Sequence, residues 1–282
     1  MDHPIVQTLS YLAAANEEYR SQLLTAPDEQ PGWLTASQLL ESRYLAPLVQ
    51  ANGLHHKATD QQSPAALWFG HYIFNIMAVA VTCYLAAGRV PDLRHASLSL
   101  RFDEDGEPQA IAWQGRKFAA LASDPAAAHP DCTPLPDADA LRLHLTRQLE
   151  AHCEAIILSL RQNSRIGVSG LWLLARDYYG SAFNWIGELL GDQARALQEA
   201  RAAAALPTQL ARQRDFVHIE HVGLSYHLID RVSCCLYYKT GEGHYCSNCP
   251  HRPMPERIER IKNWLGERAA AEAAQAAETS SS

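Results

Sequence analysis

Residues 65–87 carry no formally charged side chain, and this stretch constrains the fold more than any other feature of the sequence. As a helix it is long enough to cross a bilayer. However, His71, Asn75 and Thr82 form a polar stripe along it, and a single span would leave that stripe in lipid, which is costly. We therefore expect a central helix buried in a water-soluble fold, without stable membrane insertion. A membrane-spanning helix is the alternative.

The start and end signals of this helix are clear. Ser63 stands at the N-cap position, Pro64 occupies the first helical position, and Gly88 follows the last apolar residue. His71 and Asn75 lie four residues apart on one face. We expect them to be hydrogen-bonded core residues, and a role in lining a pocket is the alternative.

Most of the remaining pattern is helical, with two hairpins. Helices are expected at residues 34–53, 137–164, 169–192 and 193–206, the last of them ended by Pro207. Thr35 and Gln38 have the spacing of a capping box, and Gly53 is a candidate stop. Alternating apolar and polar residues predict strand pairs at 96–102 with 109–113 and at 216–222 with 224–229. Residues 114–136, rich in Pro, Ala and Asp, are a candidate boundary between two halves.

Charge and the N-terminal sequence narrow the class of protein. The formal net charge is -7, so bulk attraction to nucleic acid or anionic lipid is not expected. The first twenty residues have no basic segment followed by a long apolar run, so we expect no secretory signal and a cytoplasmic location. In a reducing compartment, a cluster of cysteines favours a metal or redox centre over disulfides.

Four of the seven cysteines lie in one short segment between Arg231 and Pro253. The pattern is Cys-Cys, ten residues, Cys, two residues, Cys, formed by Cys234, Cys235, Cys246 and Cys249. Four thiolates suit a tetrahedral zinc ion or an iron–sulfur cluster. Neighbouring cysteines in extended chain point to opposite sides, so the adjacent pair favours the larger iron–sulfur target. A zinc site and chemically inert cysteines remain alternatives.

The other candidate residues are better explained by packing. We expect Cys83, Cys132 and Cys153 not to bind metal, and the pair His152–Cys153 to lie in a helix interior. His218 and His221, on the second hairpin, are either solvated or hydrogen-bond donors near the cysteines. Trp68, Trp172 and Trp185 are expected in the core more than in a binding cleft.

The cysteine segment resembles a known family signature. The segment contains Arg231, Ser233, the Cys-Cys pair, Leu236, Tyr238, a glycine-containing loop and Cys-x-x-Cys-Pro. Together these residues are similar to the C-terminal motif of the FhuF-type ferric-siderophore reductases. Three further stretches resemble the middle of that family: LWFGHYIFNIMAVAVTCYL, LSLRFDEDGEPQAIAW and LWLLARDYYGSAFNWIGELL. The likeness therefore runs from about residue 67 to residue 250. Where many members have a Gly-Gly loop, this chain has KTGEGHY, and Glu242 and His244 there bear on cluster exposure and potential.

The resemblance implies a [2Fe–2S] cluster held by the four motif cysteines and a cytoplasmic reductase of ferric siderophores, often hydroxamates. The expected fold is α+β, predominantly helical, with two short antiparallel hairpins and a C-terminal iron–sulfur loop. We expect an N-terminal helical segment at 1–62, the FhuF-like core at 63–229, the cluster loop at 230–253, and a helix with a frayed serine tail at 254–282. No G-x-G-x-x-G or flavin motif is present, so we expect an external donor such as a ferredoxin or flavoprotein.

Positive charge gathers in the same segment. The candidates for a rim that binds an anionic ferric chelate are Arg231, Lys239, His244, His251 and Arg252. The alternative is that these residues are only solvated surface charges. Two other functions stay open from the residues. The first is a siderophore-binding or iron-delivery protein with a structural zinc, and the second is an iron–sulfur redox sensor.

Overall fold

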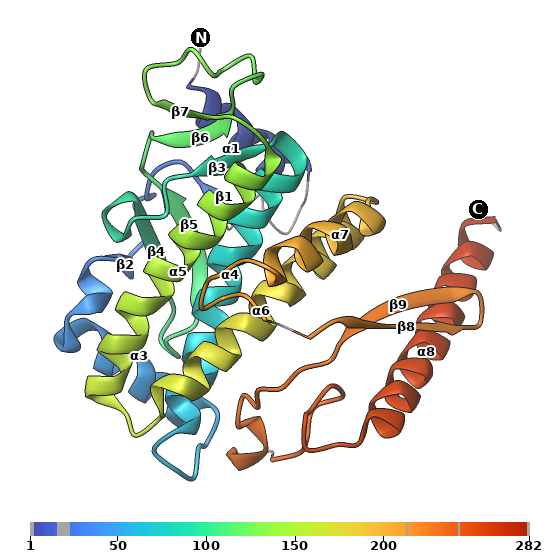
Figure 1. Cartoon of the computed structure of the whole chain (residues 1–282). Coiled ribbons are helices and arrows are strands. Elements are labelled where there is room, and N and C mark those ends of the chain that lie inside the picture. The colour runs from blue at the N-terminus through green and yellow to red at the C-terminus, as the bar shows by residue number, and fades with distance from the viewer. Residues whose placement is uncertain (1–2, 16–22, 213, 242, 281–282) are drawn as a thin grey trace.

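The computed structural model describes residues 3–15, 23–212, 214–241 and 243–280, and helix predominates in them (Figure 1). The helices are α1 (Pro4–Ala15), α3 (Ser42–His55), α4 (Ser63–Ala87), α5 (Ala138–Asn163), α6 (Val168–Leu189), α7 (Gln193–Ala204) and α8 (Met254–Ser280). Three 3-10 turns, η1 (Gln38–Leu40), η2 (His95–Ser97) and η3 (Tyr237–Lys239), complete them. The predicted α+β class with helix predominating is confirmed.

Helix α4 is the centre of the main body, packed against α6, α3 and α5. It is long and apolar enough to cross a membrane, yet 83% of its most apolar stretch is buried inside the fold. Trp68, Tyr72 and Ile76 on it are fully buried. The prediction of a buried central helix is confirmed.

The ends of α4 agree only in part with the expected signals. Gly88 ends the helix in the left-handed conformation, at φ 63°, and Pro64 lies in the first turn, both as predicted. Ser63 is not the N-cap. The Asp60 carboxylate accepts the N–H groups of Gln62 and Ser63 instead, because a carboxylate three residues upstream reaches the free amides of the first turn.

The predicted helix over 34–53 is broken in two. The capping box forms, since Thr35 Oγ1 accepts the Gln38 N–H and the Gln38 side chain accepts the Thr35 N–H. It closes only the turn η1, because Glu41 is extended and α3 begins after it. Gly53 does not stop α3. A Cβ there would lie 2.8 Å from the Pro64 ring, so glycine allows α3 to pack closely on α4.

Both predicted hairpins are present, and each belongs to a separate sheet. Strands β4 (Leu98–Phe102) and β5 (Pro108–Trp113) pair antiparallel and are extended by β1 (Leu23–Leu24) and β2 (Trp33–Thr35) into the order β1-β5-β4-β2. Strands β8 (Phe216–His221) and β9 (Leu224–Ile229) form a two-stranded hairpin. The first 62 residues, expected to be helical, therefore also supply two short strands.

A further sheet was not predicted. Strands β3 (Arg89–Pro91), β6 (Phe118–Leu121) and β7 (Cys132–Leu135) form a sheet in the order β3-β6-β7. Two of these strands lie in the segment expected to be a boundary, and Phe118, Ala119 and Ala120 are buried in the main core. Short strands of alanine and proline lack the alternation by which strands are found in a sequence.

The C-terminal region has its own small core. Ile219 and Leu228 of the β8–β9 hairpin pack against Ile261 and Leu265 of α8. Figure 1 shows this hairpin and α8 side by side at the edge of the main body. The loop that connects β9 to α8 in the chain passes along the main body. The alanine-rich segment is helical as predicted, and the last two serines of the expected frayed tail lie outside the described residues.

Candidate metal centre

The cysteine loop brings its four thiols together. Hydrogen bonds with the Cys234 and Cys246 thiols lower the pKa of Cys235. The same contacts raise the pKa of Cys234 and of Cys246. Cys249, only 2% exposed, is close enough to raise both values further. The four sulfur atoms thus act on one another at this point.

The local backbone explains how adjacent cysteines reach one place. Leu236, directly after the pair, is left-handed at φ 63°, and η3 follows it. This bend turns the Leu236 N–H toward the Cys234 sulfur at 3.4 Å and the Tyr237 N–H toward the Cys235 sulfur. At the other half, the Cys249 N–H donates to the Cys246 carbonyl at 3.1 Å, which closes a turn with both thiols on it.

One carboxylate of α6 anchors the start of the loop. Asp177 Oδ2 accepts the N–H groups of Val232 and Ser233 and the Ser233 hydroxyl. Asp177 is 1% exposed, and burial raises its pKa although these hydrogen bonds and Arg231 oppose the rise. Further along, the Asn248 amide donates to the carbonyl of Ile229 at 2.9 Å, so the loop is tied to both α6 and β9.

The surroundings of Arg231 bear on the charge of the group that the thiols would hold. Its guanidinium lies over the Tyr178 ring, 5.4 Å from the centroid, and is close enough to Cys235 and Cys246 to interact with their charge. Within the described chain, its Nε and Nη2 atoms are buried and have no hydrogen-bond partner. Buried donors without partners are costly, and an anionic metal–thiolate group beside them, such as an iron–sulfur cluster, would accept from them.

Of the five residues expected to form a positive rim, the three that are arginine or lysine are only partly exposed. Arg231 is 14% exposed and lies 3.8 Å from Asp177, while Lys239 lies 3.9 Å from Asp60. Arg252 is held inside the loop, where it donates to the carbonyls of Cys246 and Tyr245 and pairs with Glu256. His244 and His251 are exposed. Carboxylates therefore balance the charge of the two arginines and the lysine. Glu242, the acidic residue noted in the sequence of this loop, lies outside the described residues.

The other cysteines are remote from the loop. Cys83 and Cys153 are fully buried in the main core, and burial raises the pKa of Cys83 to about 12. Cys132 is half-buried in β7. His152 packs in the core as predicted and contacts the Tyr72 hydroxyl at 2.7 Å.

The hairpin histidines do not reach the cysteines. His218 stacks on His227 with centroids 4.6 Å apart, and the ring of His221 lies beside Gly266 of α8. His221 pairs with Leu224 at the turn, whereas the cysteine loop follows the opposite end of the hairpin.

A cavity of about 570 Å³ opens beside the cysteine motif, in the size range of small-molecule sites. Its walls come from α6, β9, α8 and the loop, and the lining residues are Trp185, Glu188, Leu189, Tyr226, Ser247, Ile261, Trp264 and Arg268. Ser247 stands between Cys246 and Cys249 in the sequence, so the cavity reaches the cysteine loop. Arg268 bridges it by pairing with Glu188 at 2.9 Å.

The aromatic wall of the cavity was only partly visible in the sequence. Trp185, expected in the core, packs against the main core and also lines the cavity. Trp264, which is not singled out from the sequence, meets Tyr226 edge-on at 5.4 Å and is 42% exposed. A tryptophan on an otherwise charged helix is the sequence signal for such a surface.

Comparison with known families identifies the chain. The model of the ferric iron reductase FhuF-like transporter family matches residues 66–216, which is more than half of the sequence. The chain belongs to this family. The model of the FhuF 2Fe-2S C-terminal domain matches residues 231–251, the segment that gathers the thiols. A comparison with curated proteins gives no match.

Membership of the FhuF family settles the class of cofactor and of chemistry. The C-terminal FhuF domain is a 2Fe–2S domain, so the cofactor is a [2Fe–2S] cluster and the zinc alternative falls. The family is one of ferric iron reductases, so the protein is an oxidoreductase with an iron-related redox function.

Proposed function

We propose that Cys234, Cys235, Cys246 and Cys249 ligate the [2Fe–2S] cluster and that the protein reduces ferric siderophores. The observation that carries this proposal is the cavity at the cysteine motif: one wall residue, Ser247, stands between two of the thiols. A bound ferric chelate would therefore lie next to the redox group. No nucleophile or acid–base pair is needed for this reaction.

The chemistry requires one electron. A siderophore holds Fe(III) through hard, anionic oxygens, and Fe(II) binds them less well, so reduction weakens the complex and frees the metal. When bound, the [2Fe–2S] cluster supplies single electrons to siderophore-bound Fe(III). The absence of dinucleotide and flavin motifs supports an external donor, a ferredoxin or a flavoprotein, and a cytoplasmic setting.

The residues of the chain have distinct roles in this proposal. The positive charge of Arg231, which interacts with Cys235 and Cys246, would offset the negative charge of the cluster and raise its reduction potential. Trp185, Tyr226 and Trp264 pack against the apolar parts of the chelate. Arg268 is the cation nearest to the bound ligand, and it is already oriented by Glu188.

The contacts of the loop cations give little support to the expected positive rim that steers the substrate. Arg231, Lys239 and Arg252 each have a carboxylate nearby, which offsets their positive charge. His244 and His251 are the exposed members of the set. We therefore place chelate binding in the cavity and assign those two histidines at most to its approach.

The test compares cavity and cluster variants in one assay. Chemically reduced protein is mixed with a ferric trihydroxamate without oxygen, and Fe(II) is trapped by a colorimetric chelator. Trp185→Ala should raise KM with the visible spectrum of the cluster unchanged, and Leu190→Ala, an exposed change on the same helix end, should leave KM alone. If the protein reduces no ferric chelate although its cluster is intact, the proposal fails in favour of a redox sensor.

A further inference from the structure

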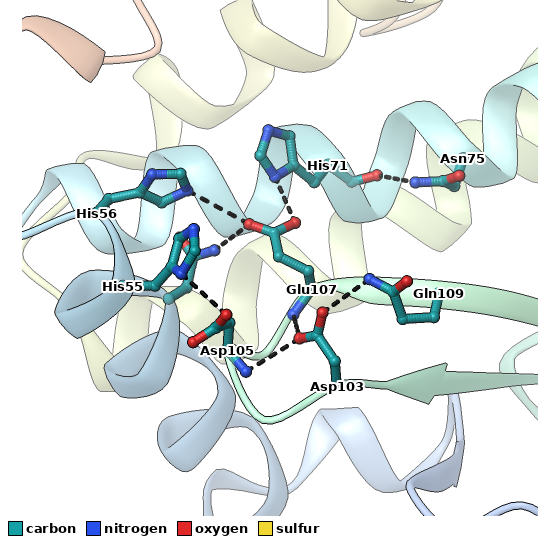
Figure 2. Close-up of polar contacts among 9 residues, drawn as sticks. His55, His56, His71, Asn75, Asp103, Asp105, Glu107 and Gln109 are labelled. Carbon is teal, nitrogen blue, oxygen red and sulfur yellow. Dashed lines mark hydrogen bonds and ion pairs between the residues drawn. The ribbon is translucent and has the colours of Figure 1, made fainter. Parts of the chain in front are cut away.

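Two histidines and a glutamate converge beside the cysteine loop (Figure 2). His71 Nδ1 lies 2.5 Å from one oxygen of Glu107, and His56 Nε2 lies 3.4 Å from the other. One ligand atom from each of the three residues lies within 4.8 Å of the others. The residues come from α4, the end of α3 and the turn before β5, so the fold itself brings them together.

The carboxylate is held from behind. Asn52, which is fully buried, donates to Glu107 Oε1, and Asp103 Oδ1 accepts the Glu107 N–H at 2.8 Å. Gly106 in the same turn has φ 76°, and a Cβ there would lie 2.4 Å from the Leu48 carbonyl of α3. The turn is therefore pressed against α3 in one conformation. Metal sites characteristically have such supporting hydrogen bonds around their ligands.

The group is reachable and carries negative charge. The exposed fractions of the side chains are 43% for His71, 18% for His56 and 21% for Glu107. Burial alone would raise the pKa of Glu107, but hydrogen bonds from His71, His56 and Asn52 outweigh it and hold that pKa below its usual value. Asn75, the other polar residue of this face, donates to the His71 carbonyl within its own helix and is not part of the group.

One residue connects this group to the thiols. The Tyr237 N–H is directed at the Cys235 sulfur, and the Tyr237 ring lies 6.1 Å from the ring of His56. The Gly241 N–H also donates to the His56 carbonyl at 3.1 Å. The histidine–glutamate group is thus a neighbour of the cysteine loop across a single aromatic ring.

We propose that His56, His71 and Glu107 bind a divalent first-row transition-metal ion, Fe(II) before the others. Two imidazoles and one carboxylate with open positions are the ligand set typical of mononuclear Fe(II) sites. Bonds of about 2.1 Å place neighbouring ligand atoms about 3 Å apart, and the two separations observed here lie on either side of that value. The choice of Fe(II) rests on the proposed function, because reduction at the cysteine loop would release that ion near this loop. The proposal that these three residues bind a metal ion does not rest on the proposed function.

A site at this place would receive the product of reduction. Fe(II) leaving the siderophore would bind imidazole and carboxylate close to the place of its release, before it diffuses into solvent. The competing explanation is a pair of hydrogen bonds that only ties the β4–β5 turn to α3 and α4. The two explanations differ in one observable property, the uptake of a metal ion.

The experiment titrates Mn(II) into cluster-loaded protein and follows loss of the free Mn(II) signal in electron paramagnetic resonance. Mn(II) prefers imidazole and carboxylate to thiolate, so it leaves the cysteines alone. We expect one ion per chain, displaced by Fe(II) under anaerobic conditions. His71→Ala and Glu107→Gln should each weaken binding by at least about tenfold, since even supporting residues of metal sites cost about 10–100-fold.

Two controls locate the ion. His55→Gln changes the neighbouring histidine, which is 46% exposed and pairs with Asp105 rather than Glu107, and should not alter uptake. His129→Gln removes a member of the other triad, His3, His129 and Asp131, and should not alter it either. The visible spectrum of the cluster reports that each variant is folded.

The outcomes separate this proposal from the proposed function. No uptake by the unaltered protein, or uptake that survives both His71→Ala and Glu107→Gln, overturns the metal site even if ferric siderophores are reduced. Uptake that depends on these residues supports the site even if no siderophore is reduced, and in that case only the assignment of Fe(II) as a reaction product falls.

Discussion

The main body and the C-terminal region are held together in different ways. In the main body, α4 is surrounded by helices and strands, and apolar side chains such as Phe69 and Leu145 are fully buried. The small core of the C-terminal region is formed by four buried apolar residues, Ile219, Leu228, Ile261 and Leu265. The loop beside it is held by hydrogen bonds and sulfur. Burial of apolar surface stabilises the first by itself. The second needs its cluster, because a small core seldom suffices for a region of this kind.

The largest effect is expected from the loop ligands. Cys234→Ser should abolish the cluster and all reductase activity, and should increase hydrogen exchange in the loop 230–253 while α4 and α5 stay protected. The reason is that the loop has few other contacts with the small core. Visible absorption and exchange measured by mass spectrometry check this. Cys132→Ser, in β7, is the matched control and should keep both the colour and the protection.

The reverse experiment breaks the main body and spares the loop. Phe69→Ala removes a fully buried ring from α4 and should lower the free energy of unfolding by about 3–5 kcal/mol. Leu54→Ala, at a side chain 73% exposed on α3, should change it by less than about 0.5 kcal/mol. Denaturant melts followed by circular dichroism give both values. Equal effects of the two changes would contradict the assignment of the core.

One of the links between the two regions is the buried carboxylate of Asp177. Asp177→Ala removes the acceptor for two N–H groups and one hydroxyl of the loop, and leaving these donors unpaired should cost about 1–3 kcal/mol. We expect faster loss of the cluster to a chelator, with only a small change in the melting of the main body. A loop that keeps its cluster as long as the unaltered protein would show that other contacts hold it.

Acid should weaken the main body through buried histidine. Burial lowers the pKa of His152 from 6.5 to about 3, and the neighbouring His95 adds to the shift. Below pH 6.5 the unfolded chain therefore binds more protons than the folded one, and stability falls as the pH drops toward 3, by about 1.4 kcal/mol per pH unit. His152→Gln should flatten this slope in melts at several pH values. An unchanged slope would place the acid sensitivity elsewhere.

The smallest effect is expected at the loop surface. Lys239→Gln removes a cation that is 32% exposed and 3.9 Å from Asp60, and such pairs contribute about 0–1 kcal/mol. The reduction rate of an anionic ferric chelate should change little, and it should depend only weakly on ionic strength. A strong, salt-dependent slowing would restore the positive rim as the guide of the substrate.

The same contrast governs what could be predicted from the sequence. Helix α4 and both hairpins were predictable, because burial against neighbours is encoded in a periodic pattern that a single segment displays. The spacing of the four cysteines indicated a site where they come together, and the kind of cofactor was indicated by the family resemblance. The β3-β6-β7 sheet was not, since its short strands form only through pairing across the chain.

Contacts between distant segments were also hidden. Glu107 stands in an acidic turn like any other, and nothing local indicates that it meets His56 and His71. Likewise, Trp264 gains its meaning from Tyr226, 38 positions earlier in the chain, across the cavity. Arg231 seemed a surface cation and is instead buried over Tyr178. In each case the partner lies on another element, so only the fold reveals the pair.

The most direct test of the central claim is a single-turnover measurement by stopped flow. Pre-reduced protein is mixed without oxygen with a ferric trihydroxamate, and reoxidation of the [2Fe–2S] cluster and formation of Fe(II) are followed together. We predict that the two signals share one rate constant and that one Fe(II) forms per cluster oxidised. Cluster reoxidation without Fe(II), or Fe(II) formed equally fast by Cys234→Ser protein, would contradict the claim that the cysteine loop delivers the electron.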